Sequence, residues 1–149
     1  MPDPRVLESF SRQSMMTSLK ARLIAAEPGR CVIDAPILPG FLQQHGAAHA
    51  AVAFALGDSA AGYAALAMMR ADQEVMTVEM KINLLSPALG ERLEAVGAVV
   101  RHGRRLSVVT AEVSSWQGQT RKTIAILQGS MIAVPQPALP GLDKAAAPK

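Results

Sequence analysis

A single carboxylate, Asp58, lies within a mostly small and apolar stretch that runs from residue 49 to residue 69. Burying a charge is costly, so a carboxylate at this position needs either a partner or a function. A carboxylate can attack a carbonyl carbon directly, or it can activate a water molecule. Other polar side chains lie just upstream of it or beside it: Gln43, Gln44, His45, His49, Ser59 and Tyr63.

Metal chemistry is disfavoured by the same residues. His45 and His49 are four residues apart, which on a helix would place both rings on one face. The glutamate that follows the first histidine in zinc protease motifs is replaced by Gly46. The lone Cys31 excludes an internal disulfide and a zinc site built on several cysteines, and we expect it to be buried and unreactive. The sequence therefore predicts no metal.

The stretch from residue 49 to residue 69 is apolar on nearly every face, which is typical of a membrane span or of a helix surrounded by protein. It is rich in alanine, it carries Asp58 near its middle and it lacks flanking aromatic or basic anchors. These features favour a central helix buried in the protein.

The segments around this helix predict an antiparallel sheet. Val78, Met80, Ile82 and Leu84 alternate with polar residues, a period of two that indicates a strand with one buried face. Short turns, RHGRR and QGQ, connect the later strands as hairpins, so the four strands after the helix are expected to form a meander. The other elements expected are a helix at 4–20 and strands at 19–26, 31–35, 93–100, 106–116 and 120–134.

The predicted fold is of the α+β class, with an antiparallel sheet wrapped around one long central helix. A chain of 149 residues fits one domain, which we place at 1–134, including an N-terminal helical segment at 1–20. Residues 135–149 are expected to form a tail rich in proline and alanine. Only 3% of the residues are aromatic, so the core must be built from small and aliphatic side chains.

The charge pattern argues against a nucleic-acid partner and for a small anionic ligand. The net charge is +3, and the basic residues are scattered except around the turn at 101–105. One Trp and one Tyr are too few to form the stacking surface of a nucleic-acid-binding protein. The first ten residues lack the basic and apolar regions of a signal peptide, so we expect a cytoplasmic protein.

The pattern of Gln43, Gly46, His49 and Asp58, followed by the segment at 77–113, resembles the hotdog-fold acyl-CoA thioesterases. The similarity is strongest to the phenylacetate-pathway and 4-hydroxybenzoyl-CoA thioesterase branch, and it covers about residues 38–134. That family has Asn or Gln, a loop glycine, the triplet His-Gly-Gly, and Asp or Glu nine residues after the histidine. This chain departs from the pattern with Ala50 in the triplet, followed by a second alanine, so two Cβ atoms are added where a ligand approaches closely.

The resemblance implies a catalytic role for five residues. Asp58 would be the nucleophile or the general base, and Thr77 would hold the attacking water. The amide of Ala50, at the start of the helix, would stabilise the oxyanion, because helix N-termini favour negative charge. Gln43 would supply or orient a second polar contact, and His49 would position the site.

The substrate implied by the resemblance is an acyl-CoA, with coenzyme A as part of the substrate and no separate cofactor. Gly46, Ala51 and Ser59 would contact it near the reacting group. The arginines of the RHGRR turn would contact its phosphates, because the guanidinium group suits bidentate recognition: Arg101, Arg104 and Arg105.

One chain cannot complete this site. Ala50 and Asp58 are separated by about 12 Å along one helix, at about 1.5 Å per residue. Hotdog enzymes solve this problem by dimerisation, so we expect a homodimer, or a dimer of dimers, with each site shared between two chains. No nucleic-acid or membrane partner is expected.

Two other functions fit the same sequence pattern. A hydratase or dehydratase with this fold would use His49 as its base, so replacing His49 would abolish turnover. For a thioesterase, Asp58→Asn should be the more damaging change. A non-catalytic acyl-CoA-binding protein is the second alternative, because the two glycines of the triplet are missing.

Overall fold

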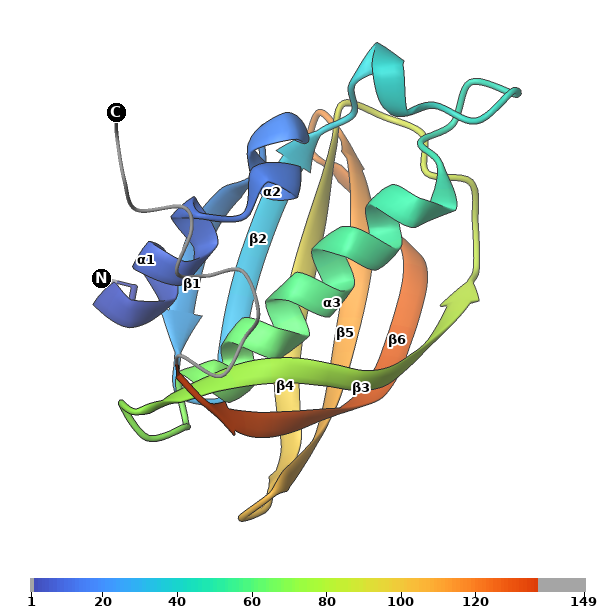
Figure 1. The fold of residues 1–149 in the computed structure, drawn as a ribbon. Helices are drawn as coiled ribbons and strands as arrows, with labels where there is room; N and C mark the ends of the chain where they lie inside the picture. The colour runs from blue at the N-terminus through green and yellow to red at the C-terminus, as the bar shows by residue number, and fades with distance from the viewer. Residues whose placement is uncertain (1, 137–149) are drawn as a thin grey trace, which may run out of the picture.

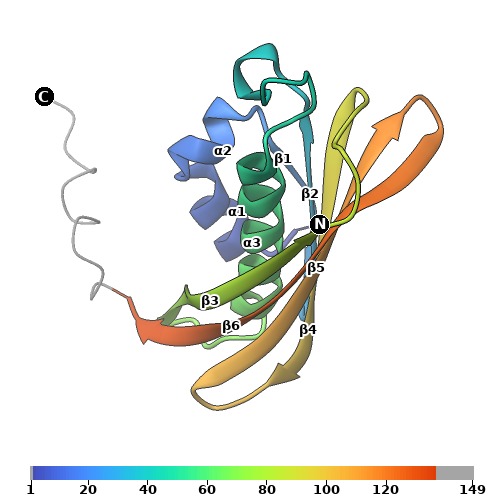
Figure 2. The ribbon, with the colours of Figure 1, turned by 90° about the vertical axis from the view of Figure 1, so that its right-hand side faces the viewer.

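Six antiparallel strands form one sheet that curves around a long helix, α3 (Figures 1 and 2). The structure is a computed structural model that describes residues 2–136. This architecture confirms the α+β fold predicted from the sequence. The elements in chain order are α1 (Pro4–Ser11), α2 (Ser14–Ser18), β1 (Arg22–Glu27), β2 (Arg30–Pro36), a 3-10 turn (Pro39–Phe41), α3 (Ala50–Leu66), β3 (Gln73–Leu84), β4 (Arg92–His102), β5 (Leu106–Gln117) and β6 (Thr120–Pro135).

α3 packs closely against the sheet because its buried residues are small. Ala60, Ala61 and Ala64 are fully buried, and Gly97 of β4 lies directly beneath them. A Cβ atom on Gly97 would overlap the backbone of Ala60, so only glycine allows the helix to lie this near to β4. The core of small and aliphatic side chains predicted from the composition is therefore confirmed, with Phe10 and Tyr63 as buried aromatic members.

The C-terminal end of α3 is held by α1. The guanidinium group of Arg5 donates hydrogen bonds to the carbonyl oxygens of Leu66, Met69 and Arg70. These carbonyls lie at the last residue of α3 and just beyond it, where a positive charge interacts favourably with the helix dipole. Arg5 thus fixes α1 beside α3, and Figure 2 shows the two helices next to each other.

The N-terminal segment forms two helices rather than the single helix expected at 4–20. Asp3 caps α1 by accepting a hydrogen bond from the amide of Arg5 at 2.8 Å. The chain leaves helical geometry at Gln13, whose φ and ψ are −77° and 101°, and α2 starts one residue later. The break turns the side chain of Gln13 toward α3.

The sheet order is β1-β2-β4-β5-β6-β3, which corrects the predicted meander. The β4–β5 and β5–β6 hairpins are present as predicted. β3 pairs with β6 and not with β4, because the other edge of β4 is occupied by β2. β3 is therefore an edge strand, and it carries the sheet around the side of α3 (Figure 2).

A β-bulge changes the side-chain phase of β3. The register with β6 shifts between Thr77 and Glu79, so Val78 is the extra residue. Val78 was expected on the buried face with Met80, but it is 55% exposed. A bulge redirects the side chains on one side of it. Thr77 consequently points toward α3 instead of away from it.

The remaining expectations concern Cys31, the tail and the membrane. Cys31 is fully buried, as predicted, and burial raises the pKa of its thiol to about 12. Pro135 still pairs with Gln73 in the sheet, whereas residues 137–149 of the expected tail lie outside the described residues. Within residues 2–136, no helix is long and apolar enough to cross a membrane.

Candidate active site

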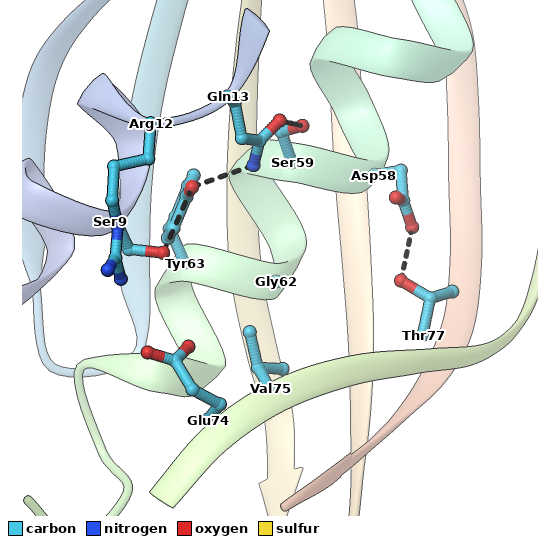
Figure 3. Close-up of a pocket in the computed structure, with 10 residues that line it drawn as sticks. All are labelled: Ser9, Arg12, Gln13, Asp58, Ser59, Gly62, Tyr63, Glu74, Val75 and Thr77. Atoms are coloured by element: carbon cyan, nitrogen blue, oxygen red, sulfur yellow. Dashed lines mark hydrogen bonds between the residues drawn. The ribbon is translucent and has the colours of Figure 1, made fainter. Parts of the chain in front are cut away.

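Asp58 and Thr77 form a hydrogen-bonded pair between the middle of α3 and β3. Thr77 Oγ1 donates to Asp58 Oδ1 at 2.8 Å, as Figure 3 shows. Asp58 is half-buried, and this burial raises the pKa of its carboxyl group, while the bond from Thr77 opposes the increase. A carboxylate with a raised pKa holds a proton more strongly, which suits a general base.

The pair lies at a cavity of about 340 Å³ between the N-terminal helices, α3 and β3. Asp58, Ser59 and Thr77 were predicted as site residues from the sequence, and the structure brings all three to this cavity. Its other lining residues are Ser9, Arg12, Gln13, Gly62, Tyr63, Glu74 and Val75 (Figure 3).

A hydrogen-bond network forms the wall of this cavity across from β3. Gln13 Nε2 donates to the hydroxyl of Tyr63 at 2.7 Å, and Ser59 Oγ donates to Gln13 Oε1 at 3.5 Å. Ser9 Oγ lies 3.4 Å from the same Tyr63 hydroxyl. The network therefore links the N-terminal segment to the helix that carries Asp58.

Most of this wall could not be assigned from the sequence. Tyr63 follows Ser59 by four residues, which places both on one side of α3 and is the one available signal. Gln13 reaches the cavity through the break between α1 and α2, and Ser9 reaches it through the docking of α1 on α3. Contacts that arise from tertiary packing have no characteristic residue spacing along the chain, so a sequence pattern cannot reveal them.

His49 caps the start of α3. Its Nδ1 accepts a hydrogen bond from the amide of Ala51 at 2.9 Å, so the neutral ring carries its proton on Nε2. The nitrogen that would serve as a base is thus engaged by the backbone, which disfavours the hydratase alternative. The capping bond also occupies the amide of Ala51, whereas the amide of Ala50 has no acceptor within residues 2–136.

Gln43 and Gly46 belong to the turn that precedes α3. The side-chain oxygen of Gln43 accepts a hydrogen bond from the amide of His45, which holds the turn in place. Gly46 has a φ of 87°, in the left-handed region that favours glycine. Gln43 and Ala50 line a second cavity of about 360 Å³, together with residues 84–88.

Within one chain, the predicted site residues are therefore divided among three places. Asp58 and Thr77 line the first cavity, while Gln43 and Ala50 line the second. The three predicted arginines, Arg101, Arg104 and Arg105, are exposed in the β4–β5 hairpin. Figure 1 shows this hairpin at the end of the sheet opposite the loop before α3.

The described part of the chain contains no group of three or more His, Cys, Asp or Glu side chains arranged to hold a metal ion. The chemistry available at the first cavity centres on Asp58, a half-buried carboxylate with the Thr77 hydroxyl beside it, and a second, buried carboxylate, Glu74, lines the same cavity. The second cavity contributes the amide of Ala50 at a helix N-terminus, which has no acceptor among residues 2–136. These groups are the parts required to attack a carbonyl carbon and to stabilise the resulting oxyanion.

Comparison with known proteins places the chain in a family. Residues 45–122 match the family model described as the thioesterase superfamily. A curated protein of Saccharolobus solfataricus whose name describes it as an esterase is 30% identical over 122 residues, which is 80% of this chain and 86% of the relative.

Solved structures give the same result. A thioesterase family protein from Silicibacter pomeroyi is 38% identical, with a TM-score of 0.86, over 88% of this chain and 96% of that chain. The Escherichia coli PaaI protein from the phenylacetic acid degradation operon is 21% identical, with a TM-score of 0.77, over 86% of this chain and 89% of that one. At that identity, the second likeness concerns the hotdog fold alone.

Proposed function

The chain belongs to the thioesterase superfamily and is a thioester hydrolase, and from this premise we propose that it hydrolyses an acyl-CoA with Asp58 as the catalytic carboxylate. The single observation that carries this assignment is the bond between Asp58 and Thr77, both of which line the first cavity. Both residues were expected from the resemblance, and the bulge in β3 brings them together.

Asp58 acts on the thioester carbonyl in one of two ways. As a general base it takes a proton from water, the oxygen of that water adds to the carbonyl carbon, and the carbon–sulfur bond breaks. As a nucleophile, its oxygen adds to the carbonyl carbon and the carbon–sulfur bond breaks, which releases the CoA thiolate to be protonated to the thiol. The mixed anhydride that remains is hydrolysed by water to the free acid and the Asp58 carboxylate. In both routes the products are a free acid and the CoA thiol, and Thr77 orients the carboxylate.

The oxyanion is stabilised by the amide of Ala50 from a second subunit. Support comes from the position of this amide, which is the first of α3 and has no acceptor within residues 2–136. The helix dipole favours negative charge there. Gln43 of the same turn supplies a further polar contact. His49 keeps the amide in place by capping the helix.

A dimer with a shared site is supported by the surface around Asp58. β3 is an edge strand, and its residues Met76 and Val78, on either side of Thr77, are 43% and 55% exposed. Phe54, one turn before Asp58 on α3, is 36% exposed. An open strand edge flanked by apolar side chains is a surface that natural proteins normally cover.

The phosphates of CoA are assigned to the exposed arginines of the β4–β5 hairpin, Arg101, Arg104 and Arg105. Guanidinium groups bind phosphate through paired hydrogen bonds. Gly46, Ala51 and Ser59 are assigned to substrate contacts nearer the thioester.

Release of free thiol from a panel of aryl and straight-chain acyl-CoAs tests this proposal. The intact protein is expected to release thiol from at least one member, and Asp58→Ala is expected to release none above the spontaneous rate. Asp72→Ala, at an exposed aspartate paired with Arg70, is the matched control and should retain activity. If no member yields more thiol with the intact protein than with Asp58→Ala, the assignment is wrong.

Sedimentation tests the shared site separately. We expect the active species to be a dimer or a larger assembly built from dimers. A strictly monomeric protein with full activity would refute a site that needs two chains.

A further inference from the structure

The polar wall of the first cavity is supplied largely by the N-terminal segment, which lies outside the residues matched by the family model. We propose that Gln13 selects acyl groups that carry a hydroxyl substituent at the end remote from the thioester. This inference rests on the proposed role of Asp58, because it needs the thioester carbonyl to lie beside that carboxylate.

The acyl group is the part of the substrate that fits this cavity. The nucleotide arm of CoA is much larger than a space of about 340 Å³, so it must remain outside when the carbonyl reaches Asp58. The cavity extends from Asp58 along α3 to Tyr63. Five residues of helix correspond to about 7.5 Å, so a substituent at that distance from the carbonyl reaches the wall.

Gln13 has hydrogen-bonding capacity left for a ligand. Its Nε2 carries two hydrogens, and one of them is donated to Tyr63 at 2.7 Å. Its Oε1 accepts from Ser59 at the long distance of 3.5 Å, which leaves a lone pair open. A ligand hydroxyl can both accept from the free N–H and donate to the free lone pair.

The wall is held rigidly. Arg5 binds α1 to the end of α3, and the ring of Phe10 packs edge-on against Tyr63 with centroids 6.0 Å apart. Tyr63 is 3% exposed. Its hydroxyl fixes the orientation of the Gln13 amide, so the free N–H points in a defined direction.

The charge in the cavity favours a neutral substituent. Two charged residues line the cavity besides Asp58: Glu74 is 7% exposed, whereas Arg12 is exposed and lies 4.0 Å from the carboxylate of Glu8. An acyl group ending in a carboxylate would therefore meet a buried like charge, while the cation of the lining is at the surface and already paired. Burial raises the pKa of Tyr63, with a further contribution from the charge of Glu74, which keeps the phenol protonated. A plain alkyl group would bury the spare polar groups of Gln13 without partners, so it should react less well.

Hydrolysis of hexanoyl-CoA and 6-hydroxyhexanoyl-CoA tests the inference, with kcat/KM measured by thiol release. The intact protein is expected to prefer the hydroxylated substrate by at least about tenfold. Gln13→Leu should bring the ratio of the two kcat/KM values close to one. Gln119→Leu, at an exposed glutamine in the β5–β6 turn, is the matched control and should preserve the ratio.

A second variant guards against misfolding of Gln13→Leu. Tyr63→Phe keeps the ring packing against Phe10 and removes the hydroxyl that orients the Gln13 amide, so it should also lower the ratio. If thiol release depends on Asp58 but kcat/KM is equal for the two substrates, this inference is wrong and the proposed function stands. An unchanged ratio in Gln13→Leu leads to the same conclusion. Absence of release that depends on Asp58 from every acyl-CoA overturns the proposed function, and this inference with it.

Discussion

Thr77→Val is the substitution that isolates the contact between β3 and Asp58. It removes the hydroxyl that donates to Asp58 at 2.8 Å, and it keeps the branched shape of the side chain. A hydrogen bond to a charged group contributes about 1.5–3 kcal/mol. Since Thr77 is exposed, we take the lower value of about 1.5 kcal/mol, which corresponds to about a tenfold decrease in kcat.

The same substitution should change the pH dependence of the reaction. The bond from Thr77 lowers the pKa of Asp58 against the effect of burial, so its loss raises that pKa further. Asp58 must be ionised to act, so activity is lost as the pH falls through its pKa. The acid limb of the kcat/KM profile should therefore move to higher pH in Thr77→Val.

Thr123→Val is the matched control for this prediction. Thr123 Oγ1 donates to Glu112 Oε1 at 3.0 Å, so the same atoms are lost from a threonine–carboxylate bond on the face of the sheet away from α3. Thiol release measured from acid to alkaline pH should be unchanged in this variant. A Thr77→Val protein that folds normally and shows an unaltered kcat and an unaltered acid limb would refute the reasoning.

Three further substitutions make separate predictions. Asp58→Asn should raise the thermal midpoint at neutral pH, because the raised pKa of Asp58 means that its ionisation destabilises the folded state. The gain in stability should appear as the pH rises above the pKa of this group in the unfolded chain, and it should vanish in acid. A variant that is less stable than the intact protein at neutral pH would contradict this. Gly62→Ala should stabilise the protein by about 1 kcal/mol in denaturant unfolding, because the added Cβ would have no neighbour nearer than 3.8 Å. Gly57→Ala should destabilise it, because the added Cβ would lie 2.8 Å from the side chain of Leu127. Equal effects of the two substitutions would disprove the packing described. His49→Ala should lower the free energy of unfolding by about 1 kcal/mol in the same assay, because the cap of α3 is lost. His49→Asn should keep most of that stability, because asparagine can also cap a helix. An equal loss in both variants would argue against capping.

The sequence was sufficient to predict the central helix and most strands, because their patterns are strong. The stretch at 49–69 has no exposed polar face, so a helix surrounded by protein was the best interpretation, and α3 occupies Ala50–Leu66. The turns RHGRR and QGQ join strands that are consecutive in the chain, and the expected hairpins are present. Local spacing is enough where neighbouring residues along the chain pair with one another.

The spacing of residue types along the chain could not predict which strands pair when they are far apart in the sequence. The alternation in β3 predicted a strand, but it could not show that this strand pairs with β6 or that Val78 is a bulge. Both facts depend on how the sheet closes around α3. The position of Thr77 beside Asp58 was expected from the family resemblance, and strict alternation would have placed its side chain on the other face.

The cavity wall shows the same limit. Asp58 and Ser59 were singled out because they interrupt an apolar run. Gln13 is a polar residue in a polar segment, so nothing in its neighbours distinguishes it. Its position follows from the break between α1 and α2 and from the docking of α1 by Arg5, which are tertiary events. Residues of this kind become visible only in the structure.

The central claim is that each active site combines Asp58 of one subunit with the turn and helix start of the other. The most direct measurement is thiol release by a mixture of Asp58→Asn and Gln43→Ala chains, refolded together. Each variant alone should be nearly inactive, but every mixed dimer would contain one intact site. With equal amounts of the two chains, random pairing makes about half of the dimers mixed, each with one intact site of two, so about a quarter of the wild-type rate should be restored. A mixture no more active than the two variants measured separately would contradict the claim.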